Sequence, residues 1–285
     1  MVYTATMKYT IIADSCCNLN SKDLTCAKVD FHVVPLTMIL GEEEYVDVEG
    51  FDTVDFVAKL NASPVTARSA CPTPEAYAEI MRKSDNIIVV ALSSKLSGTH
   101  ASATQAAESI KKSHPEKNIF VLDTLSACTG LDYICTKVKE LIMEDKYTFD
   151  ELTIKATELR EKTRVRFLLQ DLGNLVKNGR MSKTMGRILT TAKVKVVCGN
   201  DGEGGIKKYA LSMGTRRGLE KLAEFPGTEI SPDMLVIINH VHNEEDANFL
   251  KSVLVSKFGF TNISLYGMRG LSSLYAADKG IVIAY

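Results

Sequence analysis

The hydrophobic pattern of this chain consists of short apolar runs that alternate with longer amphipathic stretches. The clearest run, 87–92, holds six apolar residues, several of them β-branched, after a polar cluster at 84–86. It is too short to cross a membrane, and it predicts a buried, parallel β-strand. A loop at 93–99 follows, and 101–110 has the composition of a helix.

The same alternation extends over the first part of the chain. Strand patterns occur at 8–13, 29–40, 45–47 and 119–122, and helical patterns at 52–60, 74–83, 130–144 and 149–162. Pro35 favours a bend or a sheet edge, and Pro74 suits the first turn of a helix. Strands and helices that alternate at this spacing indicate βαβ units and a mostly parallel sheet.

The pattern of predicted elements changes near residue 163, after which strands outnumber helices. Further strands are predicted at 165–169, 193–197, 206–211, 234–239, 263–266 and 281–284, with helices at 214–224 and 244–257. An Asp-Gly turn at 200–205 predicts a hairpin. We therefore predict an α/β fold with two α/β domains, 1–164 and 165–285.

Composition narrows the class of protein. The chain has 285 residues, of which 45% are hydrophobic and 24% charged, and this is ordinary for a globular protein of two modest domains. A net charge of −1 argues against a dedicated nucleic-acid binder. No apolar run approaches the ~18 residues of a membrane span, and 1–10 lacks a signal-peptide core. Seven cysteines without C-x-x-C spacing indicate reduced thiols, so we predict a cytoplasmic protein.

Three loops rich in hydroxyl groups could meet at one site. They carry Ser69 and Thr73, then Ser94 and Ser97, then Arg269 with Ser272 and Ser273. Loops at the carboxyl ends of parallel strands hold ligands in open α/β sheets. Hydroxyls with one arginine and no general base suit the binding of a carboxylate or phosphate. The alternative is that each hydroxyl only caps a helix or satisfies its own loop.

The segment 172–200 is basic. It has six Lys or Arg residues, Arg180 and Lys183 among them, and no acidic residue. Such a surface could dock an acidic partner or a phosphorylated ligand, although a solvated helix face is the usual reason for such a pattern. His240 and His242 have no nearby Cys, Asp or Glu at zinc spacing, so no metal site is predicted. Phosphate-loop, dinucleotide and G-x-S-x-G motifs are missing from the sequence, and no cofactor is predicted.

Several short motifs stand in order along nearly the whole chain, at 9–19, 33–36, 45–47, 92–99 and 178–183. Together they resemble the DegV family of fatty-acid-binding proteins. The loop L-S-S-K-L-S-G-T at 92–99 is similar to the family's most recognisable motif, and N-G-R-M-S-K at 178–183 is similar to its G-G-R-I-S-K signature. Asn18 stands where Asp is usual in the family's D-S-x-x-D-L loop.

The resemblance implies a two-domain DegV-like fold with a long-chain fatty acid in a tunnel between the domains. It implies a carrier that is not catalytic alone and presents the carboxylate to an ATP-dependent fatty acid kinase subunit for phospholipid synthesis. In the family a Thr, a Ser and a His hold the head group. The first two correspond to Ser69 and Ser97, and Arg269 is the expected substitute for the His. Thr73, Ser94 and Ser272 would lie next to these three residues and support their side chains without contacting the ligand.

The resemblance places Arg180 and Lys183 on the surface that docks the kinase. Burial of about 16 methylenes at ~0.8 kcal/mol each would supply on the order of 10 kcal/mol of driving force. Candidate tail contacts, each equally suited to an ordinary core, are Phe167, Leu169, Met185, Ile188 and Leu189. Two other functions stay open: an enzyme or phosphotransfer component acting on a small phosphorylated or polyhydroxylated metabolite, and a nucleic-acid binder that uses 177–195.

Overall fold

The computed structural model of this chain describes residues 8–182, 194–225 and 229–285. Its first half contains a four-stranded parallel sheet in the order β2-β1-β6-β7. The strands are β1 (Tyr9–Asp14), β2 (Val29–Val34), β6 (Asn86–Ala91) and β7 (Asn118–Asp123). All six residues of β6 are buried, as the apolar run predicted. The predicted parallel sheet is therefore confirmed.

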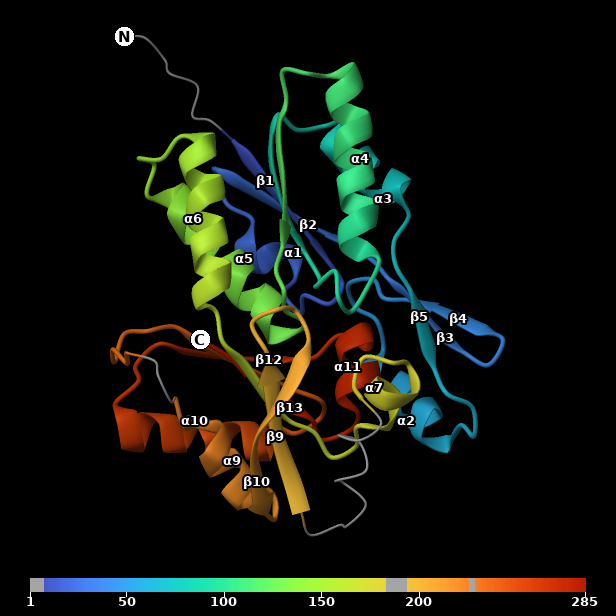
Figure 1. Cartoon of the computed structure of the whole chain (residues 1–285), viewed down its shortest axis with the longest axis vertical. Coiled ribbons are helices and arrows are strands. Elements are labelled where there is room, and N and C mark those ends of the chain that lie inside the picture. The colour runs from blue at the N-terminus through green and yellow to red at the C-terminus, as the bar shows by residue number, and fades with distance from the viewer. Residues whose placement is uncertain (1–7, 183–193, 226–228) are drawn as a thin grey trace.

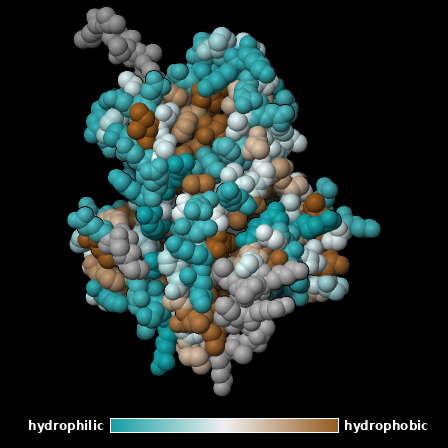
Figure 2. Space-filling model, viewed as in Figure 1, coloured by the Kyte–Doolittle hydropathy of each residue, from teal (hydrophilic) through white to brown (hydrophobic). Residues whose placement is uncertain are grey.

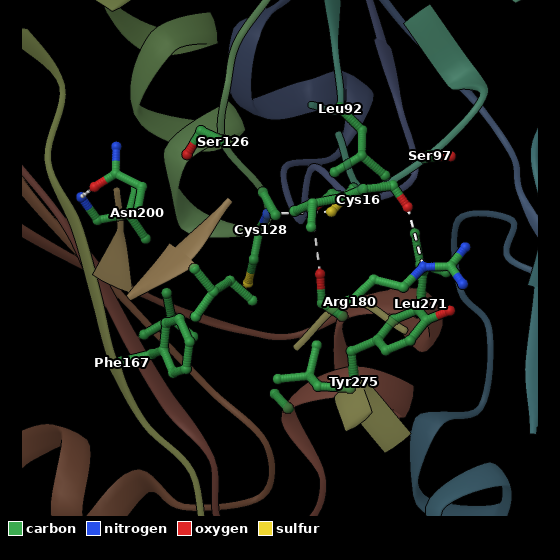
Figure 3. Close-up of a pocket in the computed structure, with 18 of the residues that line it drawn as sticks. Cys16, Leu92, Ser97, Ser126, Cys128, Phe167, Arg180, Asn200, Leu271 and Tyr275 are labelled. Carbon is green, nitrogen blue, oxygen red and sulfur yellow. Dashed lines mark hydrogen bonds between the residues drawn. The ribbon is translucent and has the colours of Figure 1, made fainter. Parts of the chain in front are cut away.

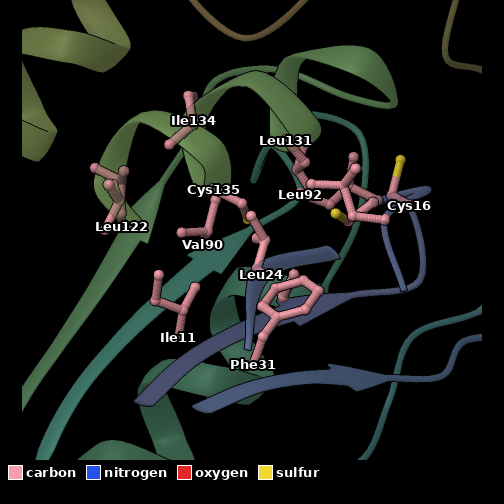
Figure 4. Packing of buried hydrophobic residues seen from close by; sticks show 14 of the residues in the cluster. Ile11, Cys16, Leu24, Phe31, Val90, Leu92, Leu122, Leu131, Ile134 and Cys135 are labelled. Atoms are coloured by element: carbon pink, nitrogen blue, oxygen red, sulfur yellow. The ribbon is translucent and has the colours of Figure 1, made fainter. Parts of the chain in front are cut away.

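Helices cover both faces of this sheet (Figure 1). They are α1 (Ser21–Leu24), α3 (Pro74–Met81), α4 (Thr99–Ser113), α5 (Thr129–Met143) and α6 (Phe149–Lys162). The first half also contains α2 (Thr53–Ala62), which lies away from this sheet in Figure 1. Because side chains alternate along a strand, Ile11 and Val90 pack with Leu131 of α5 (Figure 4). Their neighbours Ile12 and Val89 pack on the opposite face, where α3 and α4 lie.

A small antiparallel sheet, β4-β3-β5, extends from the first half. Its strands are β3 (Thr37–Leu40), β4 (Glu43–Val46) and β5 (Arg68–Ala70). Pro35 and Leu36 interrupt the long extended run at 29–40 and divide it into β2 and β3. The sequence did not predict β5, because three residues without an apolar pattern form a strand only through pairing with β3.

The second half contains a six-stranded mixed sheet in the order β10-β9-β8-β13-β11-β12. Its strands are β8 (Val165–Leu168), β9 (Val194–Asn200), β10 (Ile206–Met213), β11 (Val236–His240), β12 (Ile263–Gly267) and β13 (Ile281–Ala284). Its described helices are α7 (Gly173–Lys177), α9 (Thr215–Leu222), α10 (Glu244–Phe258) and α11 (Gly270–Ala276). β11 and β12 pair in parallel, whereas the other neighbours in this sheet are antiparallel.

The strands of the four-stranded sheet all precede residue 165, the predicted boundary between 1–164 and 165–285, and those of the six-stranded sheet begin at it. Helix α11 does not follow this division of the chain. It belongs to the second half by sequence but packs against α2 and β3 of the first half (Figure 1). The division remains a prediction, and α11 is the element that joins the two parts.

Hydrophilic residues cover most of the face seen in Figure 2, and apolar residues appear there as scattered patches. Within the described residues, no helix combines the length and apolar character that crossing a membrane requires. The same residues contain no group of three or more His, Cys, Asp or Glu side chains that could hold a metal ion. His240 accepts a hydrogen bond from the Asn243 N–H through Nδ1, and His242 lies beside Thr53.

Candidate ligand-binding cavity

A cavity lies where the loops of the parallel sheet meet the six-stranded sheet and α11. It encloses about 870 Å³ of space between atoms, with its opening to solvent counted. Its wall is mainly aliphatic and aromatic, and includes Leu92, Leu96, Phe167, Leu169, Leu175 and Val282. The residues that follow β1, β6 and β7 line it, as expected for loops at the carboxyl ends of parallel strands.

Ser69 and Tyr275 meet at this cavity from distant parts of the chain. β5 pairs with β3 through Ser69 and Met38, and this pairing fixes the direction of the serine. The Ser69 hydroxyl lies 2.9 Å from the Tyr275 hydroxyl, and both residues line the cavity. The sequence analysis does not identify Tyr275, because its pattern predicts no helix between the strands at 263–266 and 281–284. With a helix at 270–276, Ser272 and Tyr275 fall on one face, three residues apart.

Ser97 also lines the cavity, as predicted from the loop after β6. Its hydroxyl lies 2.7 Å from the Thr99 hydroxyl and accepts the Thr99 N–H at 3.3 Å. This serine therefore supports the start of α4 and also lines the cavity, and its contact with a ligand carboxylate remains a prediction.

Arg180 lies in the wall of the cavity, beside Ser97 and Tyr275 (Figure 3). Its Nε donates to the Leu96 carbonyl at 3.1 Å, and its Nη1 donates to the Asn178 carbonyl. Among the described residues, its Nη2 has no hydrogen-bond partner. The sequence predicted this arginine for a docking surface, and the structure places its cation where a bound anion could reach it. Lys183, Met185, Ile188 and Leu189 lie outside the described residues.

Arg269 requires a correction, because it does not line the cavity. Its side chain is buried, and its guanidinium donates to the carbonyls of Leu19 at 3.4 Å and Asp47 at 3.2 Å. The predicted pairing of Arg269 with a ligand carboxylate is therefore wrong. The Asp47 carboxylate accepts the N–H groups of Gly270 and Leu271. Arg269 and Asp47 thus hold the first turn of α11 and position Tyr275.

Of the three residues expected to support the head-group site, Ser272 lines the cavity, whereas Thr73 and Ser94 do not. Ser272 lines the cavity and donates to the Cys16 carbonyl at 3.1 Å. Thr73 lies away from the cavity wall and caps α3, where its hydroxyl accepts the Ala76 N–H. Ser94 is exposed, and its N–H donates to the Asp123 carboxylate at 3.1 Å. Thr73 and Ser94 are therefore local loop residues, as the alternative interpretation of these hydroxyls held.

The buried carboxylate of Asp14 holds the backbone behind the cavity in place. The Asp14 carboxylate accepts the N–H groups of Cys16 at 3.0 Å and Leu92 at 2.7 Å, and both of these residues line the cavity. Burial raises the pKa of Asp14 from 3.8 to about 7, and the hydrogen bonds oppose this shift. Burial likewise raises the pKa values of the Cys16 and Cys128 thiols, so the cavity wall presents neutral sulfur there.

The described residues that line the cavity include no Asp, Glu or His. Hydroxyls and one guanidinium can bind an anion by hydrogen bonds and charge. They supply no obvious general base for chemistry near pH 7. The arrangement suits binding of a molecule that is apolar over most of its length.

The fold and this cavity define a class, an α/β protein whose parallel sheet and mixed sheet flank a largely apolar cavity. The chain belongs to the DegV family, whose model, described as an uncharacterised protein, matches residues 8–282. It is 30% identical to a DegV domain-containing protein of Streptococcus pyogenes serotype M18 over 279 residues, which cover 98% of this chain and 99% of that protein.

Solved structures of similar proteins have the same fold as this chain. The Streptococcus pneumoniae fatty acid kinase (Fak) B3 protein loaded with linoleic acid superposes with a TM-score of 0.92 at 27% identity, over 98% of this chain and 99% of that one. A DegV family protein from Eubacterium eligens loaded with heptadecanoic acid gives 0.90 at 27% identity, over 97% and 98% of the two chains. The predicted family and fold class are thereby confirmed.

Proposed function

We propose that this protein binds a long-chain fatty acid in the cavity. The observation that carries the proposal is the distribution of polarity. Aliphatic and aromatic side chains form most of the wall, while Ser97, Tyr275 and Arg180 gather at one side (Figure 3), where Ser69 contacts Tyr275. An acyl chain with a terminal carboxylate has the same distribution. The similar proteins from Streptococcus pneumoniae and Eubacterium eligens, which are described as loaded with fatty acids, support it.

The driving force would come from the acyl chain. Removing about 16 methylenes from water at ~0.8 kcal/mol each gives on the order of 10 kcal/mol. Part of this is lost when the ligand and the protein become ordered, and nanomolar to micromolar affinity remains. The head group needs only enough donors to offset the loss of its hydration.

Two features would hold the head group. Tyr275, beside Ser69 in the cavity wall, would donate to the carboxylate through its phenol, as the resemblance expects a His to do. Arg180 would supply the positive charge that the sequence assigned to Arg269. A guanidinium keeps its proton at all physiological pH values, so binding of the carboxylate would not require a titrating histidine.

Native mass spectrometry of protein expressed in bacteria tests the proposal, because a tightly held lipid should co-purify. Titration of delipidated protein with palmitic acid should then show binding of one equivalent. The double variant S69A/S97A should bind more weakly, whereas S94A, which alters an exposed hydroxyl outside the cavity, should bind as the parent does. Absence of both co-purified lipid and fatty-acid uptake would overturn the proposal.

We further infer that the protein is a carrier and presents its fatty acid to a separate, ATP-dependent kinase subunit. The lack of Asp, Glu and His side chains among the described lining residues and the 27% identity to the fatty acid kinase B3 protein support this role. Arg180 and Lys183 are the proposed docking residues, and a partner that uses ATP would place the carrier in the cytoplasm. The test is ATP consumption by a fatty acid kinase subunit, which should require this protein with bound fatty acid. A roomy polar cleft would have favoured a metabolite enzyme, and the apolar wall does not.

A further inference from the structure

The Ser126 hydroxyl is a buried polar group at the cavity wall that the proposed head-group site does not use. Ser126 is 4% exposed and lies in the loop between β7 and α5. Its backbone is fully engaged, since its N–H donates to Thr124 Oγ1 and its carbonyl accepts the Ser93 N–H at 2.9 Å. Its Oγ has no hydrogen-bond partner among the described residues. Such a group is costly in an apolar wall, and native structures seldom leave one unsatisfied.

The side chain of Asn200 supplies a second polar group there. Asn200 lies at the end of β9 and lines the cavity. Its Oδ1 accepts the Val165 N–H at 3.0 Å, which fixes the orientation of the amide. Its Nδ2 reaches the Thr163 carbonyl only at 3.4 Å, so at least one amide hydrogen is available. In Figure 3, Ser126 and Asn200 lie at the same end of the pocket, away from Ser97 and Arg180.

The neighbouring glycine leaves room for the Ser126 hydroxyl. A Cβ at Gly130 would lie 2.0 Å from Ser126 Oγ and 2.8 Å from the Val165 side chain, which also lines the cavity. The first turn of α5 therefore omits a side chain where the hydroxyl sits. An alanine at 126 would suit a purely apolar tail site better, because it would leave no unpaired donor.

We propose that Ser126 and Asn200 form a polar subsite for an oxygen atom on the acyl chain, remote from the carboxylate. A ligand hydroxyl could donate to Ser126 Oγ after a rotation of the serine side chain and accept from Asn200 Nδ2. A keto oxygen could accept from both. The chemical class of ligand is thus a hydroxy or keto fatty acid. This inference rests on the proposed function, because it assumes that an acyl chain occupies the cavity.

The test compares delipidated parent protein with S126A and S126C. Stearic acid and a series of hydroxystearic acids, with the hydroxyl at successive carbons, are titrated against each by calorimetry. In the parent, one or two adjacent isomers should bind about tenfold more tightly than stearic acid, the effect of one good hydrogen bond in a dry site. Both variants should lose this preference, while their affinity for stearic acid stays the same or rises.

The outcomes separate the two proposals. If stearic acid and all its hydroxy derivatives fail to bind the parent, the fatty-acid function itself is overturned. If stearic acid binds and every hydroxy isomer binds more weakly, the polar subsite alone is overturned. A preference that survives in both variants also overturns it, because the oxygen would then contact another group. S126C nearly preserves the shape of the side chain, so a folding defect in S126A leaves the comparison intact, and S94A serves as the matched surface control.

Discussion

The hydroxyl oxygens of Ser69 and Tyr275 lie 2.9 Å apart, although 206 residues separate them in the sequence. One is carried by a three-residue strand and the other by the helix α11. Their contact joins the small antiparallel sheet to the second half of the chain at the edge of the cavity. The position of the head-group site therefore depends on how α11 is held, and not only on the loops of the parallel sheet.

The first prediction concerns Tyr275. Y275F removes one donor to the bound carboxylate and leaves the ring, so palmitic acid affinity should fall about three- to tenfold. Calorimetry on delipidated protein measures the change. Y147F, which alters a tyrosine outside the cavity, should bind as the parent does. Unchanged affinity in Y275F would show that the phenol does not touch the ligand.

The second prediction concerns the charge of Arg180. R180Q should lower palmitic acid affinity about tenfold or more, because a charge-assisted hydrogen bond is replaced by a neutral one. It should also reduce the dependence of affinity on salt. R216Q, at an exposed arginine that pairs with Glu245 outside the cavity, is the control. If R180Q binds fatty acid normally and fails only in the kinase assay, Arg180 acts in docking alone.

The third prediction concerns Arg269, which should matter for stability. In R269M the buried carbonyls of Leu19 and Asp47 lose their donors, each at a cost of about 1–3 kcal/mol. The free energy of unfolding in urea should fall by roughly 2–6 kcal/mol. Full stability combined with a selective loss of fatty-acid binding would restore the original assignment of Arg269 to the ligand.

The contrast between Arg269 and Tyr275 shows how much of the site can be predicted from the sequence. The apolar run at 87–92 defines β6, and strand order then brings the loop with Ser97 to the cavity. Arg269 fits the site by charge and by approximate position, but it stands at the N-cap of α11 and Tyr275 stands six residues later. At 1.5 Å per residue this is about 9 Å along the helix, enough to separate a structural arginine from a lining tyrosine. Only the packing of α11 against α2 and β3 decides which of them faces the cavity.

The fourth prediction concerns Asp14 and pH. Burial raises its pKa in the folded state to about 7, above 3.8 for an ordinary Asp, so the folded protein binds this proton more tightly than the unfolded chain does. The contribution of Asp14 to stability is therefore greatest below pH 4 and is lost as the pH rises towards 7, by about 4 kcal/mol at most.

The measurement is urea unfolding of the parent and D14N between pH 4 and pH 8. D14N cannot titrate at this position, so its stability should fall less with rising pH than that of the parent over this window. The absolute stability of D14N is not the readout, because the amide also loses one acceptor. Parallel curves for the two proteins would contradict the raised pKa.

The last prediction concerns the turn between β9 and β10, where Gly204 meets the loop after β6. The Ser93 hydroxyl donates to the Gly204 carbonyl at 2.8 Å, and a Cβ at Gly204 would lie 2.6 Å from Ser93 Oγ. G204A should therefore separate the turn from the loop. Since Gly204 lines the cavity, fatty acid should dissociate several-fold faster and the protein should be less stable by about 1–3 kcal/mol.

Gly202 provides a matched control for this variant. It lies in the same turn with a φ of +92°, against +94° at Gly204, but a Cβ there would meet nothing within 4 Å. G202A thus introduces similar backbone strain without the clash, and the difference between the two variants isolates the contact with Ser93. Stopped-flow release of a fluorescent fatty acid is the measurement. Equal release rates in G202A and G204A would show that backbone strain, and not the contact between the two halves, controls how long the ligand stays bound.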